Sequence, residues 1–304
     1  MNFGSAMCIG FLSIFSIAIF SSNETLISML AINAIVQIVL FLLVACIPFL
    51  KTGRMSFVDV AWPFGVALIG LQILLMGDGD FVRKSVVGGI YLLIGLRMGL
   101  GALMMAKTTG LIVKKEFPRY IYRRMTLEKE GSSHIKFHML TEVVAQGFAN
   151  MSVLALPGFM LAINSSGVFS GWEIAGVCIW VTAYILESTA DLQKLKFMAK
   201  NKGGVCNIGL WRYSRHPNYF AEWLVWSGLV VATVPSWLAL RATETPFVWA
   251  ILGIGALGAS AMLYTTLVYL TGAIPAEYYS AIKRPEYKEY QRTTNRFFPW
   301  FPKR

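Results

Sequence analysis

The 304-residue chain is 56% hydrophobic and only 14% charged, and its mean hydropathy is +0.59. A soluble domain carries about 25% charged residues, so this composition excludes an ordinary soluble enzyme, a disordered protein and a disulfide scaffold. Lysine and arginine nevertheless outnumber aspartate and glutamate by 27 to 16, which gives a net charge of +11. The location of these basic residues therefore carries information about topology.

Eight stretches approach the roughly 20 apolar residues that cross a bilayer. In chain order they are 4–20, 25–50, 57–76, 85–106, 139–162, 171–190, 219–240 and 246–270. No basic residue precedes the first stretch, so we interpret it as a retained span rather than a cleavable signal peptide. The sequence thus predicts an all-α polytopic membrane protein with about seven or eight transmembrane helices.

The basic residues are distributed unevenly between the predicted spans. If the spans alternate in direction, one side receives 23 of the 27 basic residues. They lie in the connectors 107–136 and 191–218, in the tail 271–304, and at Lys51 and Arg54. This asymmetry predicts that the basic side, and with it the C-terminus, faces the cytosol of an endoplasmic-reticulum or bacterial inner membrane. We attribute much of the charge in 107–136 to anchoring at lipid headgroups.

Cysteine and histidine give no sign of a metal site or a disulfide framework. The four cysteines form no C-x-x-C pair, and three of them lie in apolar stretches, as small core residues do. Three histidines are too few for a site made of several histidines. The hydropathy also favours a membrane surface over nucleic acid as the reason for the positive charge.

Five charged residues within the predicted spans stand out, because a charge at the centre of a span costs about 2.5–3.5 kcal/mol on insertion scales. They are Asp59, Arg97, Glu142, Glu187 and Glu222. Solvation at the interface or a functional role explains Asp59 and Glu142 equally well, because both lie near span ends. For Arg97 the alternative to a functional role is a structural ion pair inside the bundle.

Two segments concentrate polar residues at helical spacing. One helix face carries Tyr184, Glu187, Asp191 and Lys194, which indicates either helix packing or one wall of a cavity open to the cytosol. The second segment, 209–222, reads GLWRYSRHPNYFAE and places three basic residues before a helix that begins with proline. A helix start with nearby arginines suits an anion, especially phosphate, although a membrane anchor is an alternative for the same residues.

These segments resemble the steroid 5-alpha-reductase superfamily. The similarity rests on the run DLQK at 191–194, the string GLWRYSRHPNYF at 209–220, and Glu222. It is closest to a less-characterised branch that carries R-H-P-N-Y-F-G-E and ends in a tyrosine pair followed by an F-P-W run, here at 298–300. The resemblance covers roughly 55–302. Glycine in the motif is replaced by Ala221, and of a Leu-Glu-Glu-like run after the last span only Glu277 remains.

The resemblance implies an NADPH-dependent membrane reductase that acts on a carbon–carbon double bond conjugated to a carbonyl. It implies one integral membrane domain over 1–304, with substrate-side spans in 1–136 and a cytosolic cofactor pocket built by 137–304. The residues carried over to the cofactor side are Glu187, Asp191, Lys194, Arg212, Arg215, His216, Asn218, Tyr219, Glu222, Tyr287 and Tyr290.

The expected partners are membrane lipids and a small lipid-soluble, steroid-like substrate. Catalysis is assigned to Asp59, paired with Arg97, which would polarise the substrate carbonyl and stabilise the enolate that hydride addition to the β-carbon creates. The resemblance does not specify a steroid, because site and substrate diverge within a fold.

Two other functions fit parts of the same pattern. Membrane methyltransferases of the isoprenylcysteine or phospholipid type also carry Arg-His-Pro-x-Tyr near the C-terminus and bind S-adenosylmethionine in a cytosolic pocket. Asn218 and the continuation Phe220-x-Glu222 favour the reductase. A lipid-binding or transport protein is the third hypothesis, in which Arg97, Glu187 and Glu222 would serve a pathway through the bundle.

Overall fold

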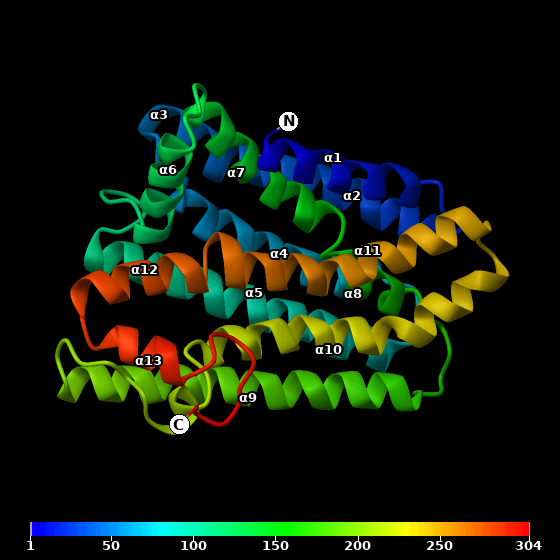
Figure 1. The fold of residues 1–304 in the computed structure, drawn as a ribbon. Helices are drawn as coiled ribbons and strands as arrows, with labels where there is room; N and C mark the ends of the chain where they lie inside the picture. The colour runs from blue at the N-terminus through cyan, green and yellow to red at the C-terminus, as the bar shows by residue number, and fades with distance from the viewer. Residues whose placement is uncertain (1, 304) are drawn as a thin grey trace. The chain divides into compact units, whose positions relative to one another are not determined.

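A computed structural model describes residues 2–303, and within that range the chain is helical apart from its connectors and an isolated bridge between Leu111 and Lys115. The α-helices are α1 (Phe3–Ala18), α2 (Glu24–Phe41), α3 (Ile47–Thr52), α4 (Val58–Met76), α5 (Phe81–Thr109), α6 (Pro118–Lys129), α7 (Ile135–Met151), α8 (Leu156–Ala162), α9 (Gly171–Lys200), α10 (Pro217–Ala239), α11 (Pro246–Thr265), α12 (Ala273–Lys283) and α13 (Tyr287–Thr293) (Figure 1). The predicted all-α class is confirmed.

Within residues 2–303, seven helical segments are long and apolar enough to cross a membrane. They are Glu24–Thr52, Met55–Met76, Phe81–Thr109, Ile135–Ala162, Gly171–Lys200, Pro217–Ala242 and Pro246–Lys283. The first predicted stretch forms α1, whose 16 residues are shorter than the other spans. The chain is therefore an integral multi-pass membrane protein, and its span count agrees with the seven or eight expected.

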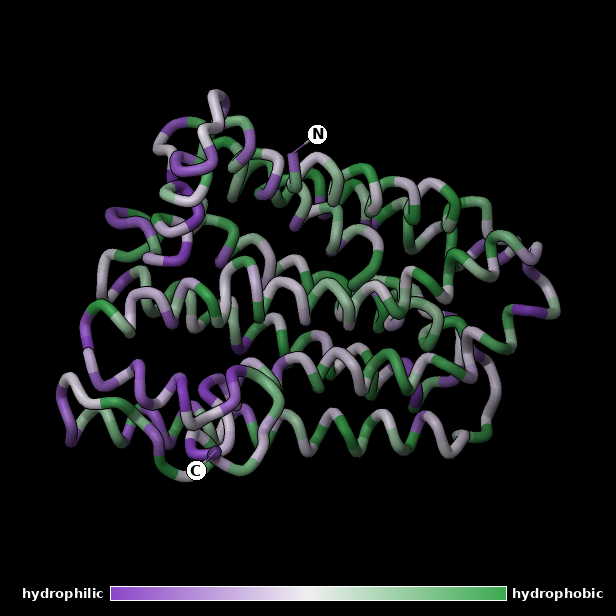
Figure 2. Tube along the Cα trace, viewed as in Figure 1, coloured by the Kyte–Doolittle hydropathy of each residue, from purple (hydrophilic) through white to green (hydrophobic). Residues whose placement is uncertain are grey.

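Hydrophilic residues gather in the connectors and in the C-terminal tail, whereas hydrophobic residues run along the helices (Figure 2). The basic residues are concentrated in every second segment that follows a span. These segments are 53–54, 110–134, 201–216 and the residues after Lys283. The observed spans therefore preserve the charge asymmetry on which the predicted cytosolic C-terminus depends.

The chain forms two compact units. Unit 1 comprises Met1–Glu173 and Ala232–Ala259, and unit 2 comprises Ile174–Val231 and Ser260–Arg304. The boundary between the two units differs from the expected division into 1–136 and 137–304, because α7 and α8 belong to unit 1. In unit 1, α4 packs along α5, and α7 packs against both α1 and α2.

Short polar residues define where several helices begin. The side-chain Oδ1 of Asn2 accepts a bond from Ser5 N at 2.7 Å, and that of Asn23 accepts one from Leu26 N at 2.8 Å. Such caps satisfy backbone N–H groups that have no partner inside the helix. At the other end, Gly110 closes α5 with a φ of 71°, a left-handed conformation that glycine adopts without strain.

A network of buried amides joins three helices of unit 1. The predicted span 139–162 is interrupted between α7 and α8, and Asn33 Nδ2 of α2 donates to the carbonyl of Asn150 at the end of α7, at 3.0 Å. Gln37 Nε2 donates to Asn33 Oδ1 and to the carbonyl of Gly65 in α4, both at 3.0 Å. Asn150 Nδ2 in turn donates to Gln37 Oε1 at 3.3 Å. These bonds satisfy backbone and side-chain groups that the interior of a bilayer leaves without water.

Replacing Gly65 by alanine should disrupt this network. A Cβ at this position overlaps both Asn150 Nδ2 and Gln37 Oε1, so the two amides must separate. We expect the free energy of unfolding to fall by about 2–3 kcal/mol, since buried polar groups lose their partners. Thermal unfolding in detergent measures the effect. Gly89→Ala is the control because a Cβ on Gly89 meets open space; equal midpoints for the two variants would contradict the prediction.

Candidate cofactor site

Helix α9 holds the polar segment before α10 in unit 2 through three contacts. Trp211 Nε1 donates to the carbonyl of Ala190 at 2.9 Å, and Leu210 N donates to Gln193 Oε1 at 2.9 Å. The ammonium of Lys194 lies over the Trp211 ring, 4.3 Å from its centroid, in a cation–π contact. The 3-10 turn Gly209–Arg212 is therefore fixed on the same part of α9 that carries Asp191.

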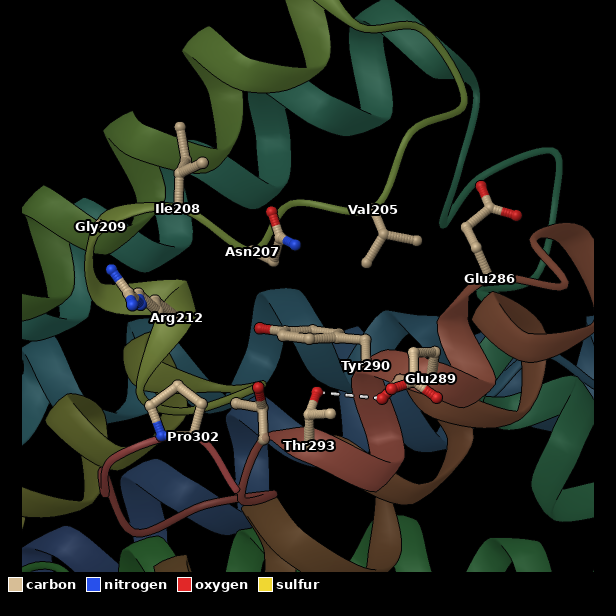
Figure 3. A pocket seen from close by; sticks show the side chains of 11 residues that line it. Val205, Asn207, Ile208, Gly209, Arg212, Glu286, Glu289, Tyr290, Thr293 and Pro302 are labelled. Atoms are coloured by element: carbon tan, nitrogen blue, oxygen red, sulfur yellow. Dashed lines mark hydrogen bonds between the residues drawn. The ribbon is translucent and has the colours of Figure 1, made fainter. Parts of the chain in front are cut away.

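A cavity of about 770 Å³ opens between this segment and α13. Its lining residues are Val205, Asn207, Ile208, Gly209, Arg212, Glu286, Glu289, Tyr290, Thr293, Thr294 and Pro302. Figure 3 shows Arg212 on one side of the cavity, Glu286 on the other, and the Tyr290 ring between them. The volume lies within the range of about 300–1,000 Å³ that is typical of small-molecule and cofactor sites.

Arg212 is the cationic group of this cavity. Its side chain is exposed and makes no hydrogen bond or ion pair with any of residues 2–303. Glu289, by contrast, already accepts bonds from Arg292 at 2.7 and 2.8 Å. A guanidinium without a protein counterion keeps its N–H donors for an anionic ligand, such as a phosphate or a carboxylate.

A second binding feature lies at the start of α10. Asn218 Nδ2 donates to Asp191 Oδ1 of α9 at 3.1 Å. Its Oδ1 is buried and has no hydrogen-bond partner among residues 2–303. Because a buried polar atom without a partner is costly, this oxygen is suited to accept a hydrogen bond from a ligand N–H or O–H group. The structure thus brings together Asp191 and Asn218, two residues that the resemblance places on the cofactor side.

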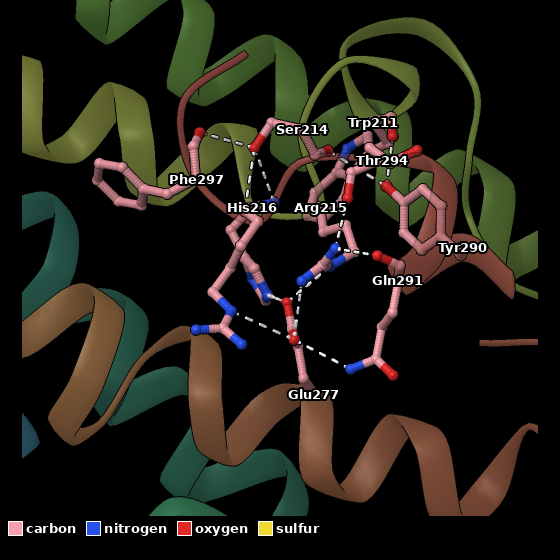
Figure 4. A network of polar contacts seen from close by, with 10 residues as sticks. Trp211, Ser214, Arg215, His216, Glu277, Tyr290, Gln291, Thr294 and Phe297 are labelled. Atoms are coloured by element: carbon pink, nitrogen blue, oxygen red, sulfur yellow. Dashed lines mark hydrogen bonds and ion pairs between the residues drawn. The ribbon is translucent and has the colours of Figure 1, made fainter. Parts of the chain in front are cut away.

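Arg215 is directed into the protein rather than toward the cavity. Its Nε and Nη2 donate to the two carboxylate oxygens of Glu277 in α12, at 2.8 and 3.1 Å (Figure 4). Its Nη1 donates to the carbonyls of Gln291, at 2.8 Å, and of Thr294. Its side-chain donors are occupied, so Arg215 is not placed to bind a phosphate in the cavity as expected.

His216 and the two tail tyrosines are also packed inward. His216 Nε2 lies 3.2 Å from Glu277 Oε1, and the ring of Tyr219 stacks on the imidazole with centroids 5.1 Å apart. Tyr290 donates its hydroxyl to the carbonyls of Trp211 and, at 3.2 Å, of Ser214. Burial raises the pKa of both Tyr287 and Tyr290, so neither phenol ionises near neutral pH. These residues tie the tail to the loop before α10, and Tyr290 also lines the cavity.

The remaining predicted cofactor-side residues lie on α9 and α10. Glu187 and Glu222 are half-buried, as are Asp191 and Tyr219, whereas Lys194 is exposed. Sequence reasoning missed Glu277 as the centre of the polar network, together with Gln291 and Arg296. A signal was present, because Glu277 is the acidic residue retained from the family-like run and buried Arg–His pairs require an acceptor.

Asp59 in unit 1 has a different partner from the one expected. Its Oδ1 pairs with Arg119 of α6, and its Oδ2 is buried without a hydrogen-bond partner among the described residues. Tyr120 lies beside this pair, and burial together with the Asp59 carboxylate raises the pKa of its phenol. Arg97 is half-buried in α5. The sequence offered no reason to choose Arg119 from a connector rich in basic residues.

Several charged residues of the connector 107–136 bind other parts of unit 1. Arg119 pairs with Asp59, and Arg123 Nε donates to Glu142 Oε1 at 2.9 Å. Glu116 accepts bonds from the backbone N–H of Met55 at 2.7 Å and of Ser56 at 3.1 Å. Several of its charges therefore fold the connector onto α4 and α7, which corrects the headgroup interpretation for these residues.

Protonation of His216 should destabilise the fold. Burial lowers the pKa of His216, and the nearby charges of Lys194 and Arg215 lower it as well. The hydrogen bond to Glu277 raises the pKa and only partly offsets these effects. Because the folded state binds the proton more weakly than the unfolded chain, whose histidine titrates near 6.5, stability is retained above that pH and lost as the pH falls below it. When the pH is lowered from 7.5 to 5.5, the thermal midpoint of the wild type should fall. The midpoint of His216→Gln should fall by a smaller amount. The exposed His134→Gln variant should follow the wild type, and equal pH profiles for all three proteins would contradict the assignment.

The fold and these contacts define an all-helical, multi-pass membrane protein with a cavity in unit 2 that one arginine and two glutamates line. Residues 47–294 match the family described as "Protein of unknown function (DUF1295)", and the chain belongs to this family. The family is associated with steroid 5-alpha-reductase-like membrane proteins.

An uncharacterized protein of fission yeast, Schizosaccharomyces pombe, is 27% identical over 173 residues, which cover 49% of this chain and 46% of that relative. The chain thus matches about half the length of the curated relative. No solved structure matches the chain.

Proposed function

We propose that the protein is an NADPH-dependent membrane reductase of a conjugated carbon–carbon double bond in a lipid or steroid-like substrate. The observation that carries this proposal is Arg212, a cation with no side-chain partner among residues 2–303 that lines a cavity of about 770 Å³ within the reductase-like segment. NADPH is rich in phosphate, and a planar guanidinium is the side chain best suited to bind phosphate at two points.

The residues of unit 2 fit such a cofactor in two ways. Arg212 would bind a phosphate group, and the unpartnered Asn218 Oδ1 would accept a hydrogen bond from an amide or hydroxyl of the cofactor. Asp191 holds Asn218 in the required orientation through its bond to Nδ2. When bound, NADPH supplies the hydride that is added to the β-carbon of the substrate.

The Asp59 cluster of unit 1 is the proposed group for the polar end of the substrate. Arg119 supplies N–H donors and Tyr120 an O–H donor beside Asp59. Donors held in place by fixed partners stabilise negative charge that develops on a carbonyl oxygen. Asp59 itself offers acceptors, so we assign it to orienting Arg119, and the sequence-based role of Arg97 remains a proposal.

A membrane methyltransferase is the second candidate, and one observation favours it. Glu286 and Glu289 line the same cavity as Arg212, so the cavity carries acidic as well as basic groups. S-adenosylmethionine is a zwitterion with an added sulfonium charge, and carboxylates suit its cationic groups. NADPH lacks such cationic groups on its phosphate side.

Calorimetric titration of the detergent-purified protein distinguishes the two cofactors. We expect NADPH to bind with micromolar affinity and S-adenosylmethionine to give no heat of binding. In a parallel titration, Asn218→Ala should weaken NADPH binding about tenfold because one hydrogen bond to a ligand is lost. Binding of S-adenosylmethionine alone would overturn the reductase and support the methyltransferase.

A further inference from the structure

We infer that Glu277 is a positioning residue for the cofactor site, an inference that rests on the proposed function. Its side chain is only 4% exposed, yet it is contacted from three separate segments of unit 2. Arg215 and His216 reach it from the loop before α10, Gln291 Nε2 donates to its Oε2 from α13 at 3.0 Å, and Arg296 Nε lies 3.4 Å from the same oxygen in the tail.

The contacts of Glu277 extend into the backbone through Arg215. Besides its two bonds to the carboxylate, Arg215 donates from Nη1 to the carbonyls of Gln291 and Thr294 and from its backbone N to Asn295 O at 2.9 Å. The Arg215–Glu277 ion pair therefore fixes an arginine that binds the tail backbone, in addition to the bonds from Tyr290 to the loop. Removing the carboxylate charge leaves a buried guanidinium without its counterion, which forces these segments to rearrange.

The segments held by Glu277 are the ones that carry the proposed ligand contacts. Arg212 lies three residues before Arg215, and Asn218 lies two residues after His216. The opposite wall of the cavity includes Tyr290 and Thr294, on either side of Gln291. Glu277 lines no part of the cavity, so it acts through the residues it holds. Outer groups that orient ligand-binding groups affect affinity by about 10- to 100-fold in metal sites, which sets the expected scale.

Unit 1 contains a matched control for this effect. Arg83 and Glu173 form an ion pair as deeply buried as that of Arg215 and Glu277, with side chains 2% and 6% exposed. Arg83 also donates to backbone carbonyls of a connector, at Asn164 and Ser166, as Arg215 does to those of the tail. Neither Arg83 nor Glu173 lines the cavity, so Glu173→Gln removes the same chemistry without touching the proposed site.

The test compares Glu277→Gln with Glu173→Gln in the full-length, detergent-purified protein, using NADPH titration and amide hydrogen exchange. We expect Glu277→Gln to weaken NADPH binding at least tenfold and to increase exchange at 213–219 and 294–300. Glu173→Gln should lower the thermal midpoint by a similar amount but leave the NADPH affinity within twofold of wild type.

A purely structural role for Glu277 predicts equal NADPH affinities for the two variants, and that result would overturn the inference. Unchanged exchange at 213–219 in Glu277→Gln would overturn it as well. If Glu277→Gln does not fold, Gln291→Ala removes one neutral donor to the same carboxylate, and its NADPH affinity must fall while exchange rises in the tail. Wild-type protein that binds no NADPH refutes the proposed function, and the exchange measurement still decides whether Glu277 holds the loop and the tail.

Discussion

Replacing Arg212 by glutamine should weaken NADPH binding by about 10- to 100-fold. Hydrogen bonds to charged groups contribute about 1.5–3 kcal/mol, and Arg212 is the cation of the cavity that no group among residues 2–303 neutralises. Titration calorimetry measures the change directly. Salt gives a second measure, because added salt screens an exposed ionic contact and should weaken NADPH binding more in the wild type than in Arg212→Gln.

Lys196→Gln is the control for Arg212→Gln. Lys196 is exposed on α9, carries the same charge and lies outside the cavity lining. We expect its NADPH affinity and salt dependence to match those of the wild type. If both variants weakened binding equally, general attraction by the basic face would explain the result, and a specific phosphate contact by Arg212 would be refuted.

Glu173→Gln should produce one of the largest losses of stability in the protein. Glu173 is the carboxylate partner of Arg83, and both side chains are almost fully buried. Breaking a buried pair by removing one partner costs about 3–5 kcal/mol, because the remaining charge is left uncompensated. Thermal or denaturant-induced unfolding in detergent measures the loss.

The exposed pair of Glu289 and Arg292 provides the comparison for this prediction. Their side chains are 60% and 71% exposed, so water screens the interaction on every accessible side. We expect Glu289→Gln to leave the unfolding midpoint unchanged. A similar midpoint for Glu173→Gln and wild type would show that Arg83 finds sufficient compensation in its carbonyl contacts, contrary to the expectation.

Hydrophobicity and charge predicted the fold class because a bilayer imposes a simple length requirement. The stretch 57–76 corresponds to α4 almost residue for residue, and 139–162 corresponds to α7 and α8 together. The interruption between α7 and α8 was not predicted, since it depends on Asn33 reaching a carbonyl more than a hundred residues away. Long-range amide contacts of this kind leave no periodic signal in the sequence.

The candidate site was predicted by segment more successfully than by role. Gly209 and Arg212 of the run 209–222 line the cavity, and Asn218 of the same run contacts Asp191. Which arginine lines the cavity could not be deduced, because Arg212 and Arg215 stand three residues apart and differ only in their partners. The position of Glu277, 62 residues from Arg215, decides the matter. Asp59 pairs with Arg119 for the same reason, since the choice among connector arginines is made by tertiary packing.

Tritium transfer shows which group leaves the cofactor and so separates a reductase from a methyltransferase. Detergent-purified protein is incubated with a membrane lipid extract and either NADPH tritiated at the nicotinamide C4 or S-adenosylmethionine tritiated at its methyl group. A reductase predicts that tritium from NADPH appears in a lipid product in the wild type and that this transfer falls at least tenfold in Arg212→Gln. Tritium transfer from S-adenosylmethionine, with none from NADPH, would contradict the proposed reductase activity.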